Sequence, residues 1–215
     1  SCSSLRDLNL TNFDTKGCKN MNNMFKGCTS LKSLDLSSFN TIQVTNMKEM
    51  FSGCSSLTYL DLSNFDTPAL KYIDRMFLDC KKLTSLEISK FDTSNVLSML
   101  DMFSECLNLK SLDVSKFKTE KVKDMAGMFY NCKNLVELQI SEFNTSNVED
   151  FSFLFYGCNK LSSLDVSHFD TSKATSMSNM FYECSNLKDL DVSSFDTSKV
   201  TDMSSMFASC TGLSS

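Results

Sequence analysis

A fixed interval of 26 residues separates nine of the ten cysteines in this 215-residue chain. These are Cys2, Cys28, Cys54, Cys80, Cys106, Cys132, Cys158, Cys184 and Cys210. We number the columns of the repeat from the cysteine, and each coil then reads approximately C-x-x-L-x-x-L-D-L-S-x-F-D-T-x-x-V-x-x-M-x-x-M-F-x-x. Eight full coils follow one another without a change of register. A period of this length is typical of solenoid proteins, in which each coil packs on its neighbours.

The large apolar residues keep to a few columns. All 13 methionines lie in columns 20 and 23, and 16 of the 18 phenylalanines lie in columns 12 and 24, whereas Phe151 and Phe153 belong to one irregular coil. One coil has too few apolar residues to bury them by itself, but stacking places each residue against its equivalents in the neighbouring coils. We therefore expect one continuous core and a single leucine-rich-type repeat domain over residues 1–215, as part of a longer protein.

Two segments of each coil differ in hydrophobic spacing. Leu57, Leu60 and Leu62 have the L-x-x-L-x-L spacing of a short strand whose alternate side chains point inward. Columns 17, 20 and 24 follow the i, i+3, i+7 spacing of one helix face. Threonine in column 14 is a suitable helix N-cap, and Thr67 is followed by Pro68, the only proline in the chain. Glycine or asparagine in column 26 then predicts the left-handed residue that ends a helix.

These segments predict an α/β solenoid. A strand and a helix in each 26-residue repeat are typical of leucine-rich repeats. The expected architecture is a right-handed arc of eight coils with parallel strands on one face and helices on the other. The alternative is a parallel β-helix with three short strands per coil, which the spacing of columns 17 to 24 disfavours.

The spacing of the cysteines indicates a role in packing and not in metal binding. Zinc ligands in proteins are usually paired two to four residues apart, whereas these cysteines are 26 apart. Stacking would bring their backbones close, but side chains in one column point the same way and so do not face one another. We expect buried thiols in place of zinc ligands or disulfides, with Cys18 also facing inward in column 17.

Charge and composition disfavour several functions. The net charge of -5 leaves no concentrated positive charge for nucleic acid, and the longest apolar runs fall far short of the roughly 20 residues that cross a bilayer. His168 is the only histidine, and it occupies column 11, which holds polar surface residues in other coils. Because each Ser or Asp near it recurs throughout the repeat, we expect neither an enzyme nor a cofactor site.

Two outward surfaces are candidates for binding. On the strand face the candidate residues are Tyr59, Asp61, Glu87, Asp113, Glu137 and Gln139. On the helix side they are Tyr130, Tyr156 and Tyr182, in column 25 of three consecutive coils, where we expect the rings to be largely exposed. The carboxylates of column 8 either accept hydrogen bonds from the serine of column 10 and nearby backbone, or recruit a cation or basic partner. We favour the strand face, because its parallel rows suit an extended partner.

The repeat resembles a known bacterial repeat. The segments Met50-Phe51-Ser52-Gly53-Cys54-Ser55-Ser56-Leu57 and 193–203, SSFDTSKVTDM, are similar to the 26-residue repeat of bacterial surface proteins and lipoproteins, which is related to the BspA-like leucine-rich repeats. The resemblance extends over the whole chain. It implies display at the cell surface or secretion, and an adhesive role in binding a host or environmental protein or glycan. The alternative is a passive spacer that presents another domain.

Overall fold

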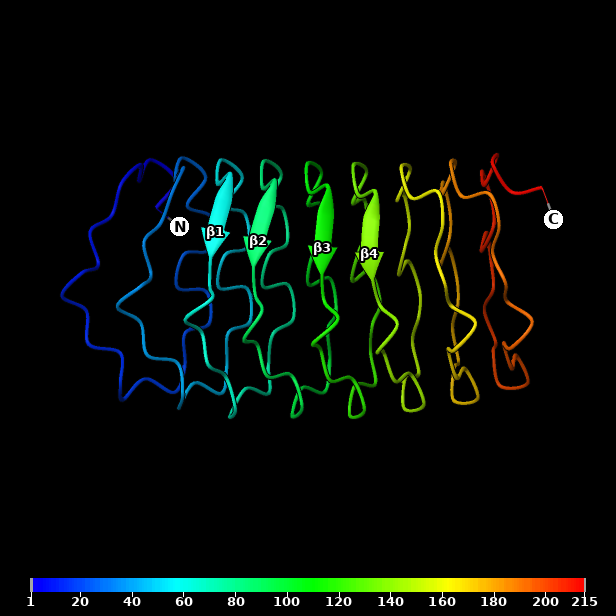
Figure 1. Cartoon of the computed structure of the whole chain (residues 1–215), viewed down its shortest axis with the longest axis horizontal. Coiled ribbons are helices and arrows are strands. Elements are labelled where there is room, and N and C mark those ends of the chain that lie inside the picture. The colour runs from blue at the N-terminus through cyan, green and yellow to red at the C-terminus, as the bar shows by residue number, and fades with distance from the viewer. Residues whose placement is uncertain (1, 215) are drawn as a thin grey trace.

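The computed structural model describes residues 2–214 and shows them as an elongated stack of similar coils (Figure 1). The coils follow one another in sequence order along the long axis of the molecule. Each coil contributes its apolar columns to a shared interior, in which Leu57, Met102 and Phe103 are fully buried. The expected stacking of equivalent columns into one core is therefore confirmed.

Four coils contain a short strand in columns 6 to 8. The strands are β1 (Tyr59–Asp61), β2 (Ser85–Glu87), β3 (Ser111–Asp113) and β4 (Glu137–Gln139). β1 pairs with β2 and β3 with β4, both in parallel and with a register of one repeat, so that Leu60 lies beside Leu86. In β1 the central leucine is buried and its two neighbours are exposed, as the alternation of a half-buried strand requires. The predicted strand segment is confirmed in these four coils.

The predicted helix is wrong. The described residues contain no α-helix, and columns 20 to 26 form a series of turns instead. In a helix the Phe51 N–H would donate to the Met47 carbonyl, four residues earlier. It donates instead to the Met76 carbonyl of the next coil, at 3.0 Å, while the Met50 N–H closes a turn onto Met47 at 3.2 Å. A further line of parallel bridges joins column 19 of neighbouring coils. Columns 17 to 26, which we call the return segment, are therefore closer to the β-helix alternative than to the predicted helix.

Left-handed residues explain why these turns do not continue as a helix. Column 22 and column 26 both have positive φ in the described coils, for example Glu49 at 55° and Gly53 at 74°. Each is the third residue of a hydrogen-bonded turn, the position that is left-handed in a type II turn. The left-handed conformation predicted for column 26 is therefore confirmed, but the residue lies within a turn and does not end a helix. Turns start at columns 20, 22 and 24. The apolar side chains of these turns therefore face the core at the same sequence spacing as one face of a helix.

Threonine in column 14 also has a different role from the predicted helix cap. The hydroxyl of Thr119 donates to the carbonyl of Asn144 in the next coil at 3.0 Å, and accepts a hydrogen bond from the Asn144 N–H at 2.7 Å. Thr93 makes the same pair of bonds with Lys118. These threonines are buried. The threonines of column 14 therefore join neighbouring coils by hydrogen bonds to the backbone.

The cysteine column lines the interior. All ten cysteines are free thiols, and the seven from Cys28 to Cys184 in column 1 are buried. The Cys106 thiol donates to the Phe77 carbonyl at 3.3 Å, and the same bond recurs between other coils. Burial raises the pKa of the Cys132 thiol to about 12. Cys2, in the first coil, is exposed, and Cys18 and Cys210 are partly buried, so the expectation of buried thiols holds for the inner coils.

Candidate interaction surface

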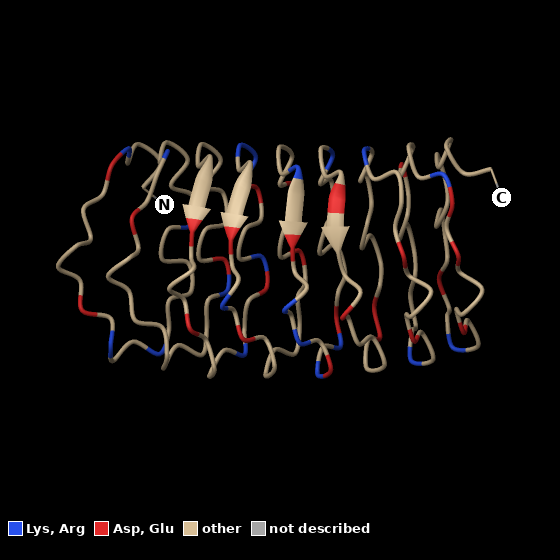
Figure 2. Ribbon diagram, viewed as in Figure 1, with Lys and Arg blue, Asp and Glu red and all other residues tan. Residues whose placement is uncertain are grey.

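The strand-face candidates lie on neighbouring coils and point outward. Tyr59 and Asp61 begin and end β1, Glu87 and Asp113 end β2 and β3, and Glu137 and Gln139 begin and end β4. All six side chains are exposed, and Tyr59 is 48% exposed. Figure 2 shows the acidic residues at the ends of β1, β2 and β3 in a row across the strands. The structure therefore brings these residues together on one face.

The aspartates of column 8 are held by hydrogen bonds from their own coil. Asp61 Oδ1 accepts from the Ser63 N–H at 2.9 Å, and Asp113 Oδ1 accepts from the Ser115 N–H at 2.9 Å. These bonds favour the ionised carboxylate, so the Ser63 backbone lowers the pKa of Asp61 and Ser115 lowers the pKa of Asp113. The predicted hydrogen bonds from column 10 are confirmed for these aspartates. A carboxylate at this position closes an Asx turn where the strand ends.

Asp165 tests this role, because its Oδ1 accepts both the N–H of Ser167 at 3.0 Å and its hydroxyl at 2.7 Å. Asp165→Ala should lower the melting temperature at pH 7 by about 1–3 °C, whereas Asp165→Asn, which keeps the acceptor, should not. The hydrogen bonds from Ser167 hold the pKa of Asp165 below its ordinary value. The stabilisation from ionised Asp165 is therefore complete above about pH 4 and is lost as the pH falls through the lowered pKa.

Thermal unfolding from pH 7 to pH 2.5 measures this difference. The wild-type melting temperature should fall relative to that of Asp165→Asn below about pH 4, since the amide does not titrate. Equal losses for the Ala and Asn variants at pH 7 would show that the acceptor makes no contribution to stability.

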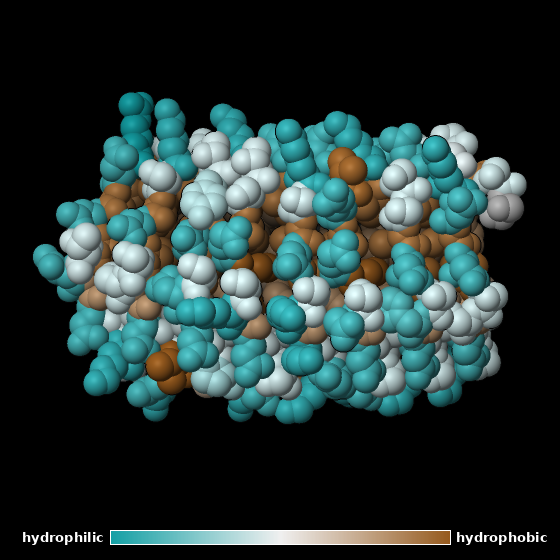
Figure 3. Space-filling model, viewed as in Figure 1, coloured by the Kyte–Doolittle hydropathy of each residue, from teal (hydrophilic) through white to brown (hydrophobic). Residues whose placement is uncertain are grey.

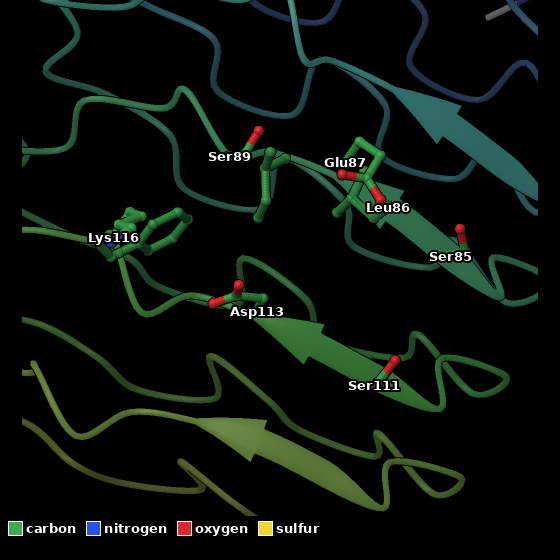
Figure 4. Close-up of a pocket in the computed structure, with 9 residues that line it drawn as sticks. Ser85, Leu86, Glu87, Ser89, Ser111, Asp113 and Lys116 are labelled. Carbon is green, nitrogen blue, oxygen red and sulfur yellow. The ribbon is translucent and has the colours of Figure 1, made fainter.

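A hollow opens where the row of strands is interrupted. β2 and β3 belong to different strand pairs, and a hollow of about 310 Å³ lies between them. It is lined by Ser85, Leu86, Glu87, Ile88, Ser89, Ser111, Asp113, Lys116 and Phe117. Figure 4 shows Glu87 and Asp113 at the ends of the two strands, with Lys116 farther along the chain beyond β3. The hollow thus combines an apolar base with hydroxyl groups and charges of both signs.

Similar hollows occur in the same columns of other coils. One is lined by residues of the first two coils, including Leu10 and Asp35, and one at the other end includes Leu138 and Asp191. Figure 3 shows hydrophobic surface along this face between rows of hydrophilic side chains. We call columns 6 to 11 of this face the strand-face groove. Its length along the stack is suited to an extended ligand.

The three tyrosines of column 25 form a stack on the return segment. The Tyr130 and Tyr156 ring centroids are 4.6 Å apart, and those of Tyr156 and Tyr182 are 4.7 Å apart, with nearly parallel planes. Each ring is half-buried, not largely exposed as predicted, because its neighbours cover its faces. The tyrosines lie in turns, not on a helix, and belong to a different segment of the coil from the strand-face candidates.

Two residues near these surfaces could not be assigned from the sequence. Lys116 occupies column 11, whose polar residues resemble an ordinary solvated face, so only the structure places it at the hollow. Phe153 occupies column 22, where other coils have Asn, Glu, Arg, Asp, Gly or Ser. The unusual residue type in this column was the only sign in the sequence that Phe153 differs from its equivalents. The structure places its ring beside Tyr130 and Tyr156.

His168 has a structural position. Its side chain is exposed, and the ring packs edge-on against Phe169 with 5.1 Å between centroids. Nε2 lies 3.1 Å from the Ile140 carbonyl of the preceding coil. Asn64, in the same column, donates from its amide to the Leu36 carbonyl at 3.0 Å. His168 therefore replaces other polar residues in a contact that joins coils.

Comparison with known proteins agrees with the repeat geometry. Residues 1–111, 84–162 and 131–215 each match one family. The chain belongs to the family described as Mycoplasma protein of unknown function, DUF285. No curated protein matches this DUF285 chain. No helix of membrane-spanning length and hydrophobicity occurs among residues 2–214.

Among solved structures, the DUF285 chain is similar to bacterial leucine-rich repeat proteins. A leucine-rich repeat protein from T. pallidum is 23% identical, with a TM-score of 0.53 over 78% of this chain and 70% of that one. A leucine-rich repeat protein from Bacteroides ovatus is 17% identical, with a TM-score of 0.38 over 92% of this chain and 63% of that one. The first likeness places the fold among leucine-rich repeat solenoids.

Proposed function

We propose that this chain is a protein-interaction repeat module at a cell surface, and that it binds an extended segment of a host or environmental macromolecule along the strand-face groove. The observation that carries the proposal is the recurrence of hollows in the same columns of successive coils. A ligand that follows the stack would meet an equivalent hollow in several coils. Repeat solenoids commonly use such extended faces for binding.

The chemistry of the groove suits a polar, extended ligand. Serine hydroxyls in columns 6 and 10 can both donate and accept hydrogen bonds, and Leu86, Ile88 and Phe117 add apolar side chains to the lining. Coil-specific residues add to this pattern: Tyr59 and Glu137 lie in column 6 of the groove, and Val136 lies next to the groove in column 5. Tyr59 and Val136 are large apolar side chains with about half of their surface exposed, at 48% and 50%. Exposed residues that differ between coils supply selectivity for one partner, which the repeated residues cannot.

Surface display is supported by the resemblance of the repeat to bacterial surface proteins and lipoproteins. The same resemblance supports an adhesive role toward a host or environmental protein or glycan. The proposed ligand class is therefore a macromolecule outside the cell, and its attachment requires no cofactor and no chemical step.

A passive spacer is the second candidate. It is favoured by the column 8 aspartates, because Asp35, Asp61 and Asp191 already accept hydrogen bonds from their own coil and need no partner. A spacer, however, has no use for coil-specific residues on an exposed face. The two candidates therefore differ in whether Tyr59 and Glu137 contribute to any interaction.

Binding of the labelled chain to an array of purified extracellular proteins and glycans tests the proposal. Tyr59→Ala/Glu137→Lys should lower the affinity for the bound component by about tenfold or more, because it removes an exposed aromatic residue and reverses a charge at the groove. Tyr130→Ser/Tyr156→Ser/Tyr182→Ser is the matched variant on the return segment and should retain that binding.

Both variants require thermal unfolding to show that the fold is kept. Loss of binding in the tyrosine variant alone would contradict a groove on the strand face. Undiminished binding in both, or no bound component on the array, would favour the spacer.

A further inference from the structure

A notch interrupts the row of large side chains in column 25. Leu78 precedes it and the stack of Tyr130, Tyr156 and Tyr182 follows it, but the intervening residue is Ser104. The notch is lined by Leu78, Leu100, Asp101, Ser104, Ala126, Gly127, Tyr130 and Phe153, and encloses about 440 Å³. One face of the Tyr130 ring is covered by Tyr156, with 4.6 Å between centroids. The small size of Ser104 leaves its other side without a stacked neighbour in column 25.

Three small residues form the floor of the notch. Ser104, Ala126 and Gly127 occupy positions at which both neighbouring coils have larger side chains. A Cβ atom added to Gly127, which has a φ of 60°, would lie 2.3 Å from Asp101 Oδ1. The carboxylate of Asp101 therefore lies directly against the glycine at the floor. Glycine at this column both permits the left-handed backbone and leaves room for the carboxylate.

The dimensions of the notch fit a single flat group. Leu78 and Tyr130 are two coils apart, so roughly 10 Å separates equivalent atoms along the stack at about 4.8 Å per coil. A planar group that stacks at about 3.5 Å from the Tyr130 ring would fill the missing position in the row. The flanking walls, Leu100 and Phe153, are apolar. The notch thus accepts one planar group with its edge toward Asp101.

The surroundings of the notch are acidic. Columns 19 to 26 of five coils, residues 72–79, 98–105, 124–131, 150–157 and 176–183, contain seven carboxylates. The carboxylates are Asp74, Asp79, Asp101, Glu105, Asp124, Asp150 and Glu183. Three of them form ion pairs within the chain, Asp74 with Lys48, Asp79 with Lys81 and Asp101 with Arg75, which leaves an excess of four negative charges. Burial, and then the neighbouring Asp150, Asp74 and Asp101, raise the pKa of Asp124, which agrees with crowding of negative charge. The remaining negative charge favours a cationic occupant.

We propose that the notch binds the side chain of an arginine from a partner protein. The guanidinium is planar and cationic, stacks on aromatic faces and donates hydrogen bonds to carboxylates. In the notch it would stack on Tyr130 and donate to Asp101. The protein's own Arg75 already donates to Asp101 Oδ2 at 3.1 Å, so the ligand guanidinium would donate to the other oxygen, Oδ1, which lies against Gly127. The notch lies on the return segment and is independent of the strand-face groove.

Phe153 adds a second observation at the same site. Its φ is 59°, a conformation that is unfavourable for a bulky side chain and that other coils give to smaller, polar or flexible residues. The side chain is 38% exposed. Its ring packs against Tyr130 and Tyr156, with centroids 6.2 Å and 6.0 Å apart. The ring therefore lies along the edge of the Tyr130–Tyr156 stack and adds an exposed aromatic side chain to the lining of the notch.

The pentapeptides Ser-Gly-Arg-Gly-Ser and Ser-Gly-Lys-Gly-Ser test the proposal. Titration into the full chain is followed by NMR of the methyl groups of Leu78, Leu100 and Ala126, which lie around the notch. The arginine peptide should shift these signals with an affinity at least about fivefold higher than that of the lysine peptide, because lysine offers no planar group for stacking.

Two variants localise the effect. Ser104→Tyr should extend the tyrosine stack into the notch and weaken binding of the arginine peptide by about tenfold or more, and Asp101→Asn should weaken it while keeping the shape of the notch. Ser52→Tyr is the control, since it adds a tyrosine to the same column two coils away. Melting temperatures confirm that each variant is folded.

The peptide titrations can support or overturn the arginine notch. Weaker binding in Ser104→Tyr and Asp101→Asn, with Ser52→Tyr unchanged, supports the arginine notch. Equal affinity for the two peptides would instead indicate general attraction to the acidic surface and overturn the proposal. Unchanged binding in Ser104→Tyr, or no shift of the methyl signals with either peptide, would also overturn it. The array experiment on the strand-face groove does not depend on any of these results.

Discussion

Phe103→Ala should lower the free energy of unfolding by about 3–5 kcal/mol, the usual cost of removing a fully buried ring. Phe103 is fully buried and stacks between Phe77 and Phe129, with centroids 5.5 Å and 5.8 Å away. Its removal leaves a cavity in the middle of the row. The surrounding coils cannot easily close this cavity, because backbone hydrogen bonds to both neighbours hold their spacing, such as Phe103 N–H to the Met128 carbonyl at 2.9 Å.

Urea unfolding followed by circular dichroism measures this loss. Phe207→Ala is the matched control, since Phe207 stacks on one neighbour, Phe181, and is 42% exposed. It should lose less than half as much stability as Phe103→Ala, because its side chain is only partly removed from water. Equal losses at the two positions would show that stacking on both sides contributes little.

Thr119→Val should lower the free energy of unfolding by about 1–3 kcal/mol, although the two side chains have nearly the same shape. The hydroxyl of Thr119 is buried and satisfies both the N–H and the carbonyl of Asn144. Valine leaves these two backbone groups without their partner at the join between two coils. The cost arises from the unpaired polar groups, since the apolar volume is retained.

Thr119→Ser is the control that keeps the hydroxyl. It should retain most of the hydrogen-bond contribution and lose only the small contribution of the methyl group. Urea unfolding of the three proteins in parallel distinguishes the two contributions. A serine variant as unstable as the valine variant would mean that the methyl packing of Thr119, and not its hydroxyl, joins the coils.

Much of the candidate surface could be anticipated from columns alone. Outward residues of a strand alternate with inward ones, so Tyr59, Glu87 and Glu137 could be placed on one face before the structure was known. The hydrogen bond from Ser115 to Asp113 was one of the two alternatives that the pairing of columns 8 and 10 predicted. The hollow between β2 and β3 and the notch at Ser104 could not be anticipated, because each depends on residues from different coils.

The sequence by itself determined the period, the stacking of equivalent residues and the strand of columns 6 to 8. These properties follow from which side chains are apolar and how far apart they recur, and they require no knowledge of backbone partners. The buried cysteine column followed from the same regularity.

Only the tertiary structure decided how the backbone of columns 17 to 26 satisfies its hydrogen bonds. Helical spacing and a row of turns place apolar side chains inward at the same columns, so the sequence pattern allowed both. The choice depends on whether an N–H such as that of Phe51 donates within its own coil or to Met76 in the next. With a left-handed residue in columns 22 and 26, the donors point to the neighbouring coil, and a partner there exists only once the coils have stacked.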